Sequence, residues 1–144
     1  MRQAVFMQSF ARSPESIWAF LADLSNDTSW RQEIFSVKHV SGTRMEAGAE
    51  YLETVAWQGL RSEVTLTIQE SVPGSRLVVG SEGPGYNSTS RWTFEPQGEG
   101  SLVTLVFVLE TTGPVHLAED LIWGVISRWL ERDLPRLEGH LSCC

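Results

Sequence analysis

The sequence contains only two cysteines among its 144 residues, and they stand together at its C-terminal end as Cys143 and Cys144. Adjacent cysteines with no His or Asp beside them supply neither a disulfide framework nor a zinc site. We therefore interpret residues 142–144 as a disordered tail. The chain also has no P-loop, no Gly-rich dinucleotide fingerprint after a strand and no HExxH pair, so we expect no metal and no other cofactor. A redox-active or metal-capturing tip is the functional alternative for these two thiols.

Basic residues are also few. The chain has 11 Lys and Arg against 18 Asp and Glu, which gives a formal net charge of −7 at pH 7. Nucleic acids and anionic membranes are bound by clustered Lys and Arg, because their phosphates carry negative charge. The charge therefore argues against both classes of partner.

Long apolar runs are missing as well. No stretch approaches the roughly 20 apolar residues that cross a bilayer, so we expect no integral membrane segment. Residues Met1–Gln8 lack the apolar core and the small-residue cleavage site of a signal peptide. These features predict a cytoplasmic protein.

The first thirty residues predict a strand followed by helices. Gln3–Phe10 is a β-compatible run, and Ser13 with Pro14 then gives an N-cap and a first helical residue. The apolar residues that follow recur at steps of three and four, at Ile17, Trp18, Phe20, Leu21 and Leu24. Ser25–Asp27 is a stop signal, after which we expect a second short helix or turn that carries Trp30.

From Glu33 to Glu110 the apolar residues follow a period of two, which is typical of strands. Turn signals divide this segment at Ser41–Gly42, Gln58–Gly59, Pro73–Gly74, Gly83–Gly85 and Gln97–Gly100. The breaks leave six strands, and such short connections make the sheet antiparallel.

After Gly113 and Pro114 the pattern is helical again to about Leu141, a length of about 27 residues. One apolar stripe runs along this helix, formed by Val115, Ala118, Ile122, Ile126, Trp129 and Leu137. Pro135 cannot donate a backbone hydrogen bond, so we expect a bend there. The sequence thus predicts an α+β fold in one domain, residues 1–144, with an antiparallel sheet of about seven strands wrapped around a long C-terminal helix.

A two-residue turn at Gln58–Gly59 fixes the register of one hairpin. Trp57 then faces Leu60, Val55 faces Ser62, Glu53 faces Val64 and Tyr51 faces Leu66. These residues form the apolar inner face, on which Glu53 and Ser62 are the polar exceptions. An unpaired buried carboxylate costs several kcal/mol unless it finds a partner or its pKa shifts, so Glu53 is the first candidate for a functional role.

Small residues between aromatic residues predict a cavity. Ser88 and Ser90 share one face of their strand with Tyr86, Trp92 and Phe94. Such small side chains leave unfilled volume between the strand and the helix that covers it. Because the helix is too rigid to move into this volume, space remains for a ligand. The alternative is that the two serines belong to the solvated start of the strand.

Other residues are candidates for the rim or the interior of this cavity. Trp30 and Trp57 are expected at its mouth, although core packing is the commoner role of a tryptophan. Asp133, Glu119 and His39 are candidates whose direction the sequence leaves open. The full set predicted to line the cavity is Trp30, Phe35, Tyr51, Glu53, Val55, Trp57, Ser62, Val64, Leu66, Ser88, Ser90, Trp92, Phe107, Ile122, Ile126 and Trp129.

The order of these elements and several short motifs resemble the START-like superfamily (SRPBCC), and within it the polyketide cyclase/dehydrase and lipid-transport proteins. The likeness covers nearly the whole chain and rests on residues of the first helix and of three turns: Ala11–Leu24 with Trp30, Ala47–Ala49, Val72–Leu77 and Phe94–Gly100. The resemblance implies a helix-grip fold, in the order β-α-α-β6-α, with a deep cavity between a curved sheet and the last helix. It carries over no common set of catalytic residues.

Three functions follow as hypotheses. The first is binding of a hydrophobic or amphipathic small molecule such as a lipid, a polyketide or another aromatic metabolite. The alternative is an aromatase/cyclase-like enzyme in which Glu53 transfers protons. The third is a protein-interaction or co-chaperone role, which requires an exposed apolar patch. The sequence leaves a homodimer open.

Overall fold

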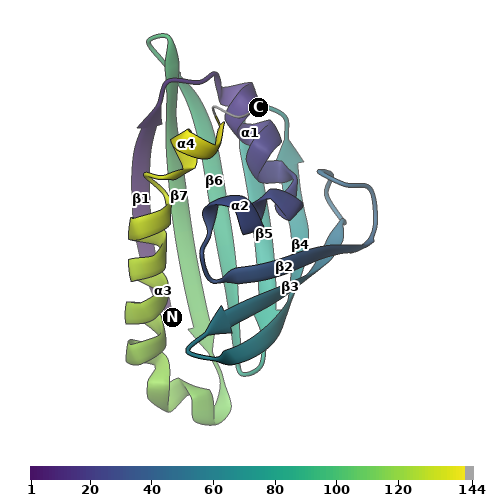
Figure 1. Ribbon diagram of the computed structural model, residues 1–144, viewed down its shortest axis with the longest axis vertical. Coiled ribbons are helices and arrows are strands. Elements are labelled where there is room, and N and C mark those ends of the chain that lie inside the picture. The colour runs from purple at the N-terminus through teal and green to yellow at the C-terminus, as the bar shows by residue number, and fades with distance from the viewer. Residues whose placement is uncertain (142–144) are drawn as a thin grey trace.

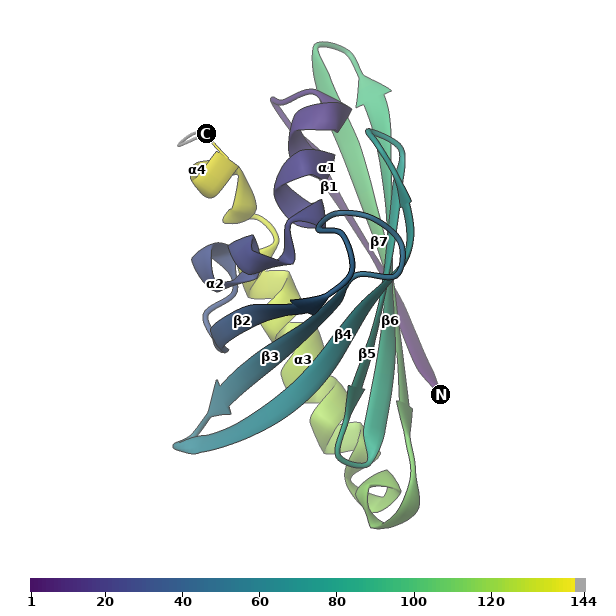
Figure 2. The same cartoon turned by 90° about the vertical axis from the view of Figure 1, so that its right-hand side faces the viewer.

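The computed structural model describes residues 1–141 of the chain. Seven strands form one antiparallel sheet in the order β1-β7-β6-β5-β4-β3-β2, which agrees with the predicted α+β class. The strands are β1 (Arg2–Phe10), β2 (Ile34–Ser41), β3 (Glu50–Trp57), β4 (Leu60–Val72), β5 (Arg76–Gly83), β6 (Tyr86–Gln97) and β7 (Gly100–Thr111). The sheet curves strongly, so that β2 and β3 turn forward over its concave side (Figures 1 and 2).

The first helices follow the predicted signals. Helix α1 (Pro14–Ala22) begins behind the N-cap Ser13, whose hydroxyl accepts a hydrogen bond from the Ser16 amide at 3.2 Å. A 3₁₀ turn, η1 (Leu24–Asn26), leads into the short helix α2 (Asp27–Trp30). Trp30 is therefore carried by a second short helix, as predicted, and its side chain is buried.

The β3–β4 hairpin has the predicted register. Trp57 pairs with Leu60 and Glu53 pairs with Val64, across a turn formed by Gln58 and Gly59. Both turn residues have positive φ, 49° and 78°, which is the backbone twist that a two-residue hairpin loop requires. A short loop of this kind fixes which side chains face the concave side of the sheet.

The C-terminal helix is shorter than predicted. The segment begins with a 3₁₀ turn, η2 (Gly113–Ala118), continues as α3 (Glu119–Asp133), and ends with a separate short helix, α4 (Leu137–Leu141). The prediction of one helix to about Leu141 was wrong because Pro135 ends α3 and does not merely bend it. The chain makes 3₁₀-type bonds there instead, from the Arg136 amide to the Asp133 carbonyl and from the Leu137 amide to the Leu134 carbonyl.

The core lies between the concave face of the sheet and the helices. Helix α1 packs over β5, β6 and β7, whereas α3 runs beside β1 (Figures 1 and 2). The central strands supply fully buried side chains such as Leu77, Val103, Leu105 and Leu109. In contrast, the apolar residues in the first three turns of α3 are at most half-buried. Space therefore remains beneath α3.

None of the helices in residues 1–141 combines the length and the apolar character needed to cross a bilayer. The predicted disordered tail, residues 142–144, lies outside the described residues.

Candidate functional site

A cavity of about 110 Å³ lies between the concave face of the sheet and helix α3. Its walls are mostly apolar and come from α1, α2, the central strands and α3. The apolar and aromatic residues that line it are Leu21, Leu24, Trp30, Val55, Val64, Leu66, Leu77, Val79, Tyr86, Trp92, Leu105, Phe107, Ile126, Trp129 and Leu130. Its polar lining residues are Asp27, Arg31, Glu53, Ser81, Ser88 and Ser90.

Most of the predicted lining residues lie on this cavity. They are Trp30, Glu53, Val55, Val64, Leu66, Ser88, Ser90, Trp92, Phe107, Ile126 and Trp129. They converge because the regular alternation of β3, β4 and β6 places every second side chain on the concave face. Ser88 and Ser90 thus contribute to the lining, as expected from their position between larger residues.

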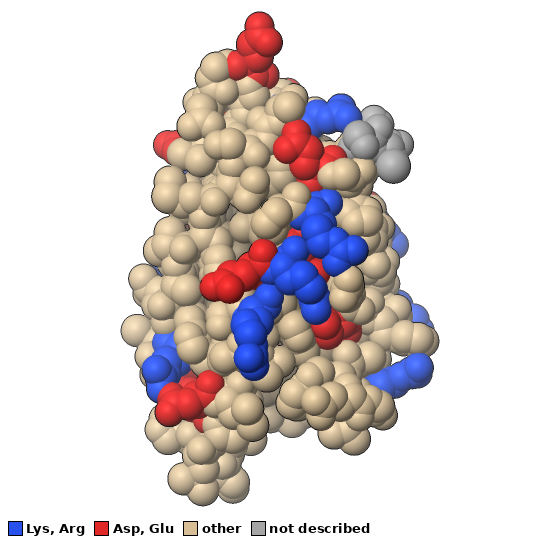
Figure 3. Space-filling view, turned by 60° about the vertical axis from the view of Figure 1, so that its left-hand side comes forward, with Lys and Arg blue, Asp and Glu red and all other residues tan. Residues whose placement is uncertain are grey.

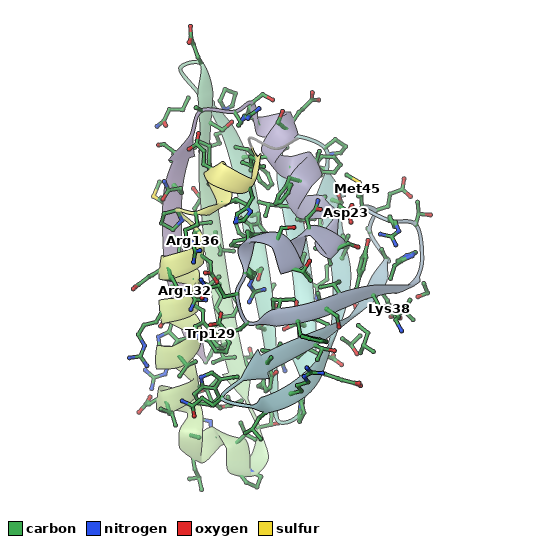
Figure 4. The ribbon with its side chains drawn as sticks, in the orientation of Figure 1. Asp23, Lys38, Met45, Trp129, Arg132 and Arg136 are labelled. Carbon is green, nitrogen blue, oxygen red and sulfur yellow. The ribbon has the colours of Figure 1, made fainter. Side chains whose placement is uncertain are left out.

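Five residues of the predicted set do not line the cavity: Phe35, described below, and four others. Tyr51 is fully buried in the core, where its ring lies 5.1 Å from that of His39. Ser62 and Ile122 are outside the lining, and Ile122 is half-buried against the core. Trp57 stands at the tip of the hairpin, 39% exposed, and meets Trp129 of α3 edge to face with ring centres 6.4 Å apart. This contact joins the hairpin to the helix beside the cavity, and Figure 4 shows Trp129 on the side of α3 that faces the hairpin.

Phe35 was predicted to face inward, and the structure places it outside. Its side chain is 56% exposed. The guanidinium carbon of Arg61 lies over the Phe35 ring, 3.8 Å from the ring centre. The cause is an irregularity in the β2–β3 pairing, where Ile34 pairs with Val55 but Ser36 pairs with Thr54. The extra residue reverses the alternation of β2, so Ile34 is buried and Phe35 turns outward.

One end of the cavity brings together three charged side chains from two segments. Glu53 comes from β3, whereas Asp27 and Arg31 come from α2 and the residue after it. The Oε2 atom of Glu53 is buried and has no hydrogen-bond partner within the described residues. The nearest cation is the Nη1 atom of Arg31, at 4.0 Å. Asp27 is held by Trp30, whose indole N–H donates to Oδ1 at 3.4 Å.

Burial changes the protonation of both acids. Loss of hydration raises the pKa of Asp27 to about 7, since the stabilising effect of Arg31 is smaller and the Glu53 carboxylate opposes it. Burial likewise raises the pKa of Glu53, against the opposing effect of Arg31. Asp27 is therefore partly protonated near neutral pH.

Asp27 was not among the predicted site residues. The sequence places it in a polar stretch that ends the first helix, which is typical of an exposed turn. It nevertheless precedes Trp30 by three residues, and residues three apart on a helix share one face. Once Trp30 is placed inside, this spacing indicates that Asp27 lies inside as well.

A second part of the lining carries hydroxyl groups. The hydroxyls of Ser81 and Ser88 form a hydrogen bond across β5 and β6. The Tyr86 phenol bonds to Ser62, and burial raises the pKa of this phenol. Its ring lies over Gly83, where an added Cβ would come 2.5 Å from the ring, so a larger residue there would displace the Tyr86 side chain. These hydroxyls can bind a polar group of a ligand.

The three residues whose direction was left open have other partners. Asp133 is 1% exposed, but its carboxylate accepts from Arg132 Nε–H at 2.7 Å, and Arg132 also donates to Glu33 at 2.9 Å. Glu119 accepts from the Thr111 hydroxyl, and His39 Nε2 lies 2.8 Å from the Gly42 carbonyl oxygen. Within residues 1–141, none of the three lines the cavity.

Charged side chains of both signs gather on one face of the protein. Figure 3 shows Lys and Arg side chains gathered in the middle of this face, with Asp and Glu side chains around them. Arg132 and Arg136 follow one another up the C-terminal end of α3 and into the turn after it (Figure 4).

Within the described residues, no group of three or more His, Cys, Asp or Glu side chains is arranged to hold a metal ion.

Comparisons with known proteins agree with this architecture. The family model described as "Polyketide cyclase / dehydrase and lipid transport" matches residues 3–141. The crystal structure of TTHA0849 from Thermus thermophilus is 20% identical, with coverages of 99% of this chain and 98% of that one, and superposes with a TM-score of 0.79. A START superfamily protein from Mycobacterium smegmatis is 16% identical, with coverages of 96% and 98% and a TM-score of 0.77. No functionally curated protein matches the chain by sequence.

Proposed function

Because the chain belongs to the polyketide cyclase/dehydrase and lipid-transport family, within the START-like superfamily, we propose that it binds an apolar or amphipathic small molecule in the cavity beneath α3. The observation that supports this most is the unpartnered Oε2 atom of Glu53, buried against an apolar cavity. A native protein leaves few buried polar groups without a partner, and a ligand can supply the missing one.

The size of the cavity limits what the closed form can hold. At about 110 Å³ it is smaller than an apolar cavity of about 150 Å³ that takes up benzene. Small-molecule sites more often measure about 300–1,000 Å³. Even a one-ring compound, and all the more a lipid or a polyketide, therefore requires that α3 move away from the sheet. Because its residues are only partly buried, moving α3 costs less free energy than moving a fully packed helix would.

The direct experiment is to denature freshly purified protein, extract it with organic solvent and identify the released molecules by mass spectrometry. We expect an apolar or amphipathic compound in the extract of the wild-type protein. The variant Ser90→Leu, which fills the cavity from β6, should release none. The matched control Thr89→Leu, one residue earlier and on the opposite face of the same strand, should release the same compound as wild type. Empty extracts from wild type, with no uptake of apolar probes, would contradict the proposal.

A second function is favoured by the two acids. Burial in an apolar cavity raises the pKa of both acids, that of Asp27 to about 7, and general acid–base catalysis near neutral pH uses groups whose pKa is raised in this way. An aromatase/cyclase-like enzyme would need both acids for proton transfer. Conversion of the extracted compound by wild type, and its loss in Glu53→Gln with binding retained, would separate a catalyst from a carrier.

A further inference from the structure

A polar atom on the cavity wall has no hydrogen-bond partner within residues 1–141. It is the Oε2 atom of Glu53, a residue that is 5% exposed and lines the cavity from β3. The register of the β3–β4 hairpin, which pairs Glu53 with Val64, keeps this side chain on the concave face. A carboxyl oxygen accepts hydrogen bonds, so this position lacks a donor.

The donors that α2 and the residue after it bring to this carboxyl group do not reach it. The indole N–H of Trp30 donates to Asp27 instead. The Nη1 atom of Arg31 lies 4.0 Å from Oε2 of Glu53, which is beyond hydrogen-bond distance. The Arg31 guanidinium also lies 5.9 Å from the centre of the Trp30 ring, so two contacts hold it at this end of the cavity.

The strands around this carboxyl group supply no donor within the described residues. On β2, which pairs with β3, Lys38 is exposed and His39 Nε2 lies 2.8 Å from a backbone carbonyl oxygen. On β6, the Tyr86 phenol bonds to Ser62. The ionisable residues closest to the carboxyl group along β3 and β4 are exposed: Glu50, Arg61 and Glu63.

The gap of 4.0 Å between Oε2 of Glu53 and Nη1 of Arg31 is one that a single oxygen atom can bridge. An oxygen placed about 2.8 Å from both atoms makes a hydrogen bond of ordinary length to each. It must donate to the carboxyl group and accept from the guanidinium. A hydroxyl group does both, whereas an ammonium group only donates and a carbonyl or ether oxygen only accepts.

We propose that the ligand carries a hydroxyl group, which donates to Oε2 of Glu53 and accepts from Nη1–H of Arg31. This rests on the proposed function, since it requires that a ligand enter the cavity. The ligand is then an alcohol or a phenol with an apolar body. That body lies against Trp30 and Trp92, which line the cavity with ring centres 6.2 Å apart.

The test uses four one-ring molecules of nearly equal size: benzyl alcohol, ethylbenzene, anisole and benzylammonium. Since all four need a similar movement of α3, the differences between them report on the polar group. Their dissociation constants are measured at pH 7 by protein-observed ¹H–¹⁵N NMR. Benzyl alcohol should bind to the wild-type protein more tightly than benzylammonium, which cannot accept a hydrogen bond from Arg31.

Variants of the two bridged residues give the decisive readout. Glu53→Met removes the acceptor and should weaken binding of benzyl alcohol about tenfold, the effect of one hydrogen bond to a charged group. Ethylbenzene and anisole should bind to this variant as they do to wild type. Arg31→Met should weaken binding of benzyl alcohol and of anisole, and should spare ethylbenzene. The matched controls Glu63→Met and Arg61→Met change exposed residues of β4 and should leave all four affinities unchanged.

The outcomes separate this inference from the proposed function. Equal effects of Glu53→Met on benzyl alcohol and ethylbenzene would overturn the inference, and so would tighter binding of benzylammonium than of benzyl alcohol to wild type. A loss of anisole binding in Glu53→Met as large as that of benzyl alcohol would mean that Glu53 donates, which also contradicts it. In each case binding of ethylbenzene would keep the cavity as a ligand site. Failure of all four molecules to bind to wild type would contradict the proposed function itself.

Discussion

The Oε2 atom of Glu53 lies 4.0 Å from the guanidinium of Arg31, too far for a hydrogen bond, and no other described residue provides it with a partner. A buried carboxyl group held in this way is costly for folding. Its place on the wall of an apolar cavity makes Glu53 the first residue to test for contact with a bound molecule.

Asp27 should make the protein less stable at alkaline pH. Its pKa is 3.8 without burial and about 7 in the folded protein, so the folded state holds a proton that the unfolded state has already lost. Stability from this group is present below pH 4 and is lost as the pH rises to about 7. Asp27→Asn should therefore raise the free energy of unfolding at pH 8, by an amount on the order of 4 kcal/mol at most, and change it little at pH 4. Urea unfolding at both pH values measures the difference; an equal effect at the two would contradict the assignment.

Filling the cavity should stabilise the empty protein while it abolishes uptake of apolar probes. Ser90→Leu places apolar atoms in the space beneath α3, for a gain of roughly 1 kcal/mol. Thr89→Leu, on the outer face, should affect neither property in this way. Thermal unfolding and probe titration are compared for the two variants. Undiminished uptake by Ser90→Leu would show that probes bind elsewhere.

The contact between Trp57 and Trp129 should control how fast a ligand enters and leaves. Trp57→Ala removes the ring that joins the β3–β4 hairpin to α3, so exchange should accelerate several-fold in both directions with a smaller change in affinity. Leu60→Ala is the matched control, since Leu60 is the cross-strand partner of Trp57 and is highly exposed. Stopped-flow or NMR exchange rates measure the effect, and equal rates in the two variants would mean that the ligand enters by another route.

Arg132 should matter for stability and not for binding. Arg132→Ala leaves the buried carboxylate of Asp133 without its cation, and loss of one partner from a buried pair costs about 3 kcal/mol. Arg128→Ala, at an exposed position one turn earlier in α3, should cost much less. Adding Asp133→Asn to Arg132→Ala should recover part of the loss. Chemical unfolding tests this; a loss in Arg128→Ala as large as that in Arg132→Ala would contradict it.

The sequence predicted the parts of the site whose positions depend on local signals. The Gln58–Gly59 turn has two residues, so it determined the register that brings Glu53 to the concave face. The alternation in β6 placed Ser88 and Ser90 on that face in the same way. The START-like resemblance and the helix-grip fold are confirmed by the family match and by the solved structures.

Other parts depend on contacts that no local pattern shows. A bulge in β2 turned Phe35 outward, and nothing in the residues around it distinguishes a bulged strand from a regular one. The apolar period continues past Pro135, which led to the prediction of a helix that is too long. Asp27 was missed because a polar residue at a helix end is usually exposed, and only the packing of α2 against β2 and α4 buries it.

The central claim is that a small apolar molecule occupies the space beneath α3, and intermolecular NOEs test it most directly. With ethylbenzene bound to isotope-labelled protein, we predict NOEs from the ligand to the methyl groups of Val64, Val79 and Ile126, which line the cavity. NOEs confined to methyl groups on the outer face of the sheet, such as those of Val5 and Val106, would contradict the claim.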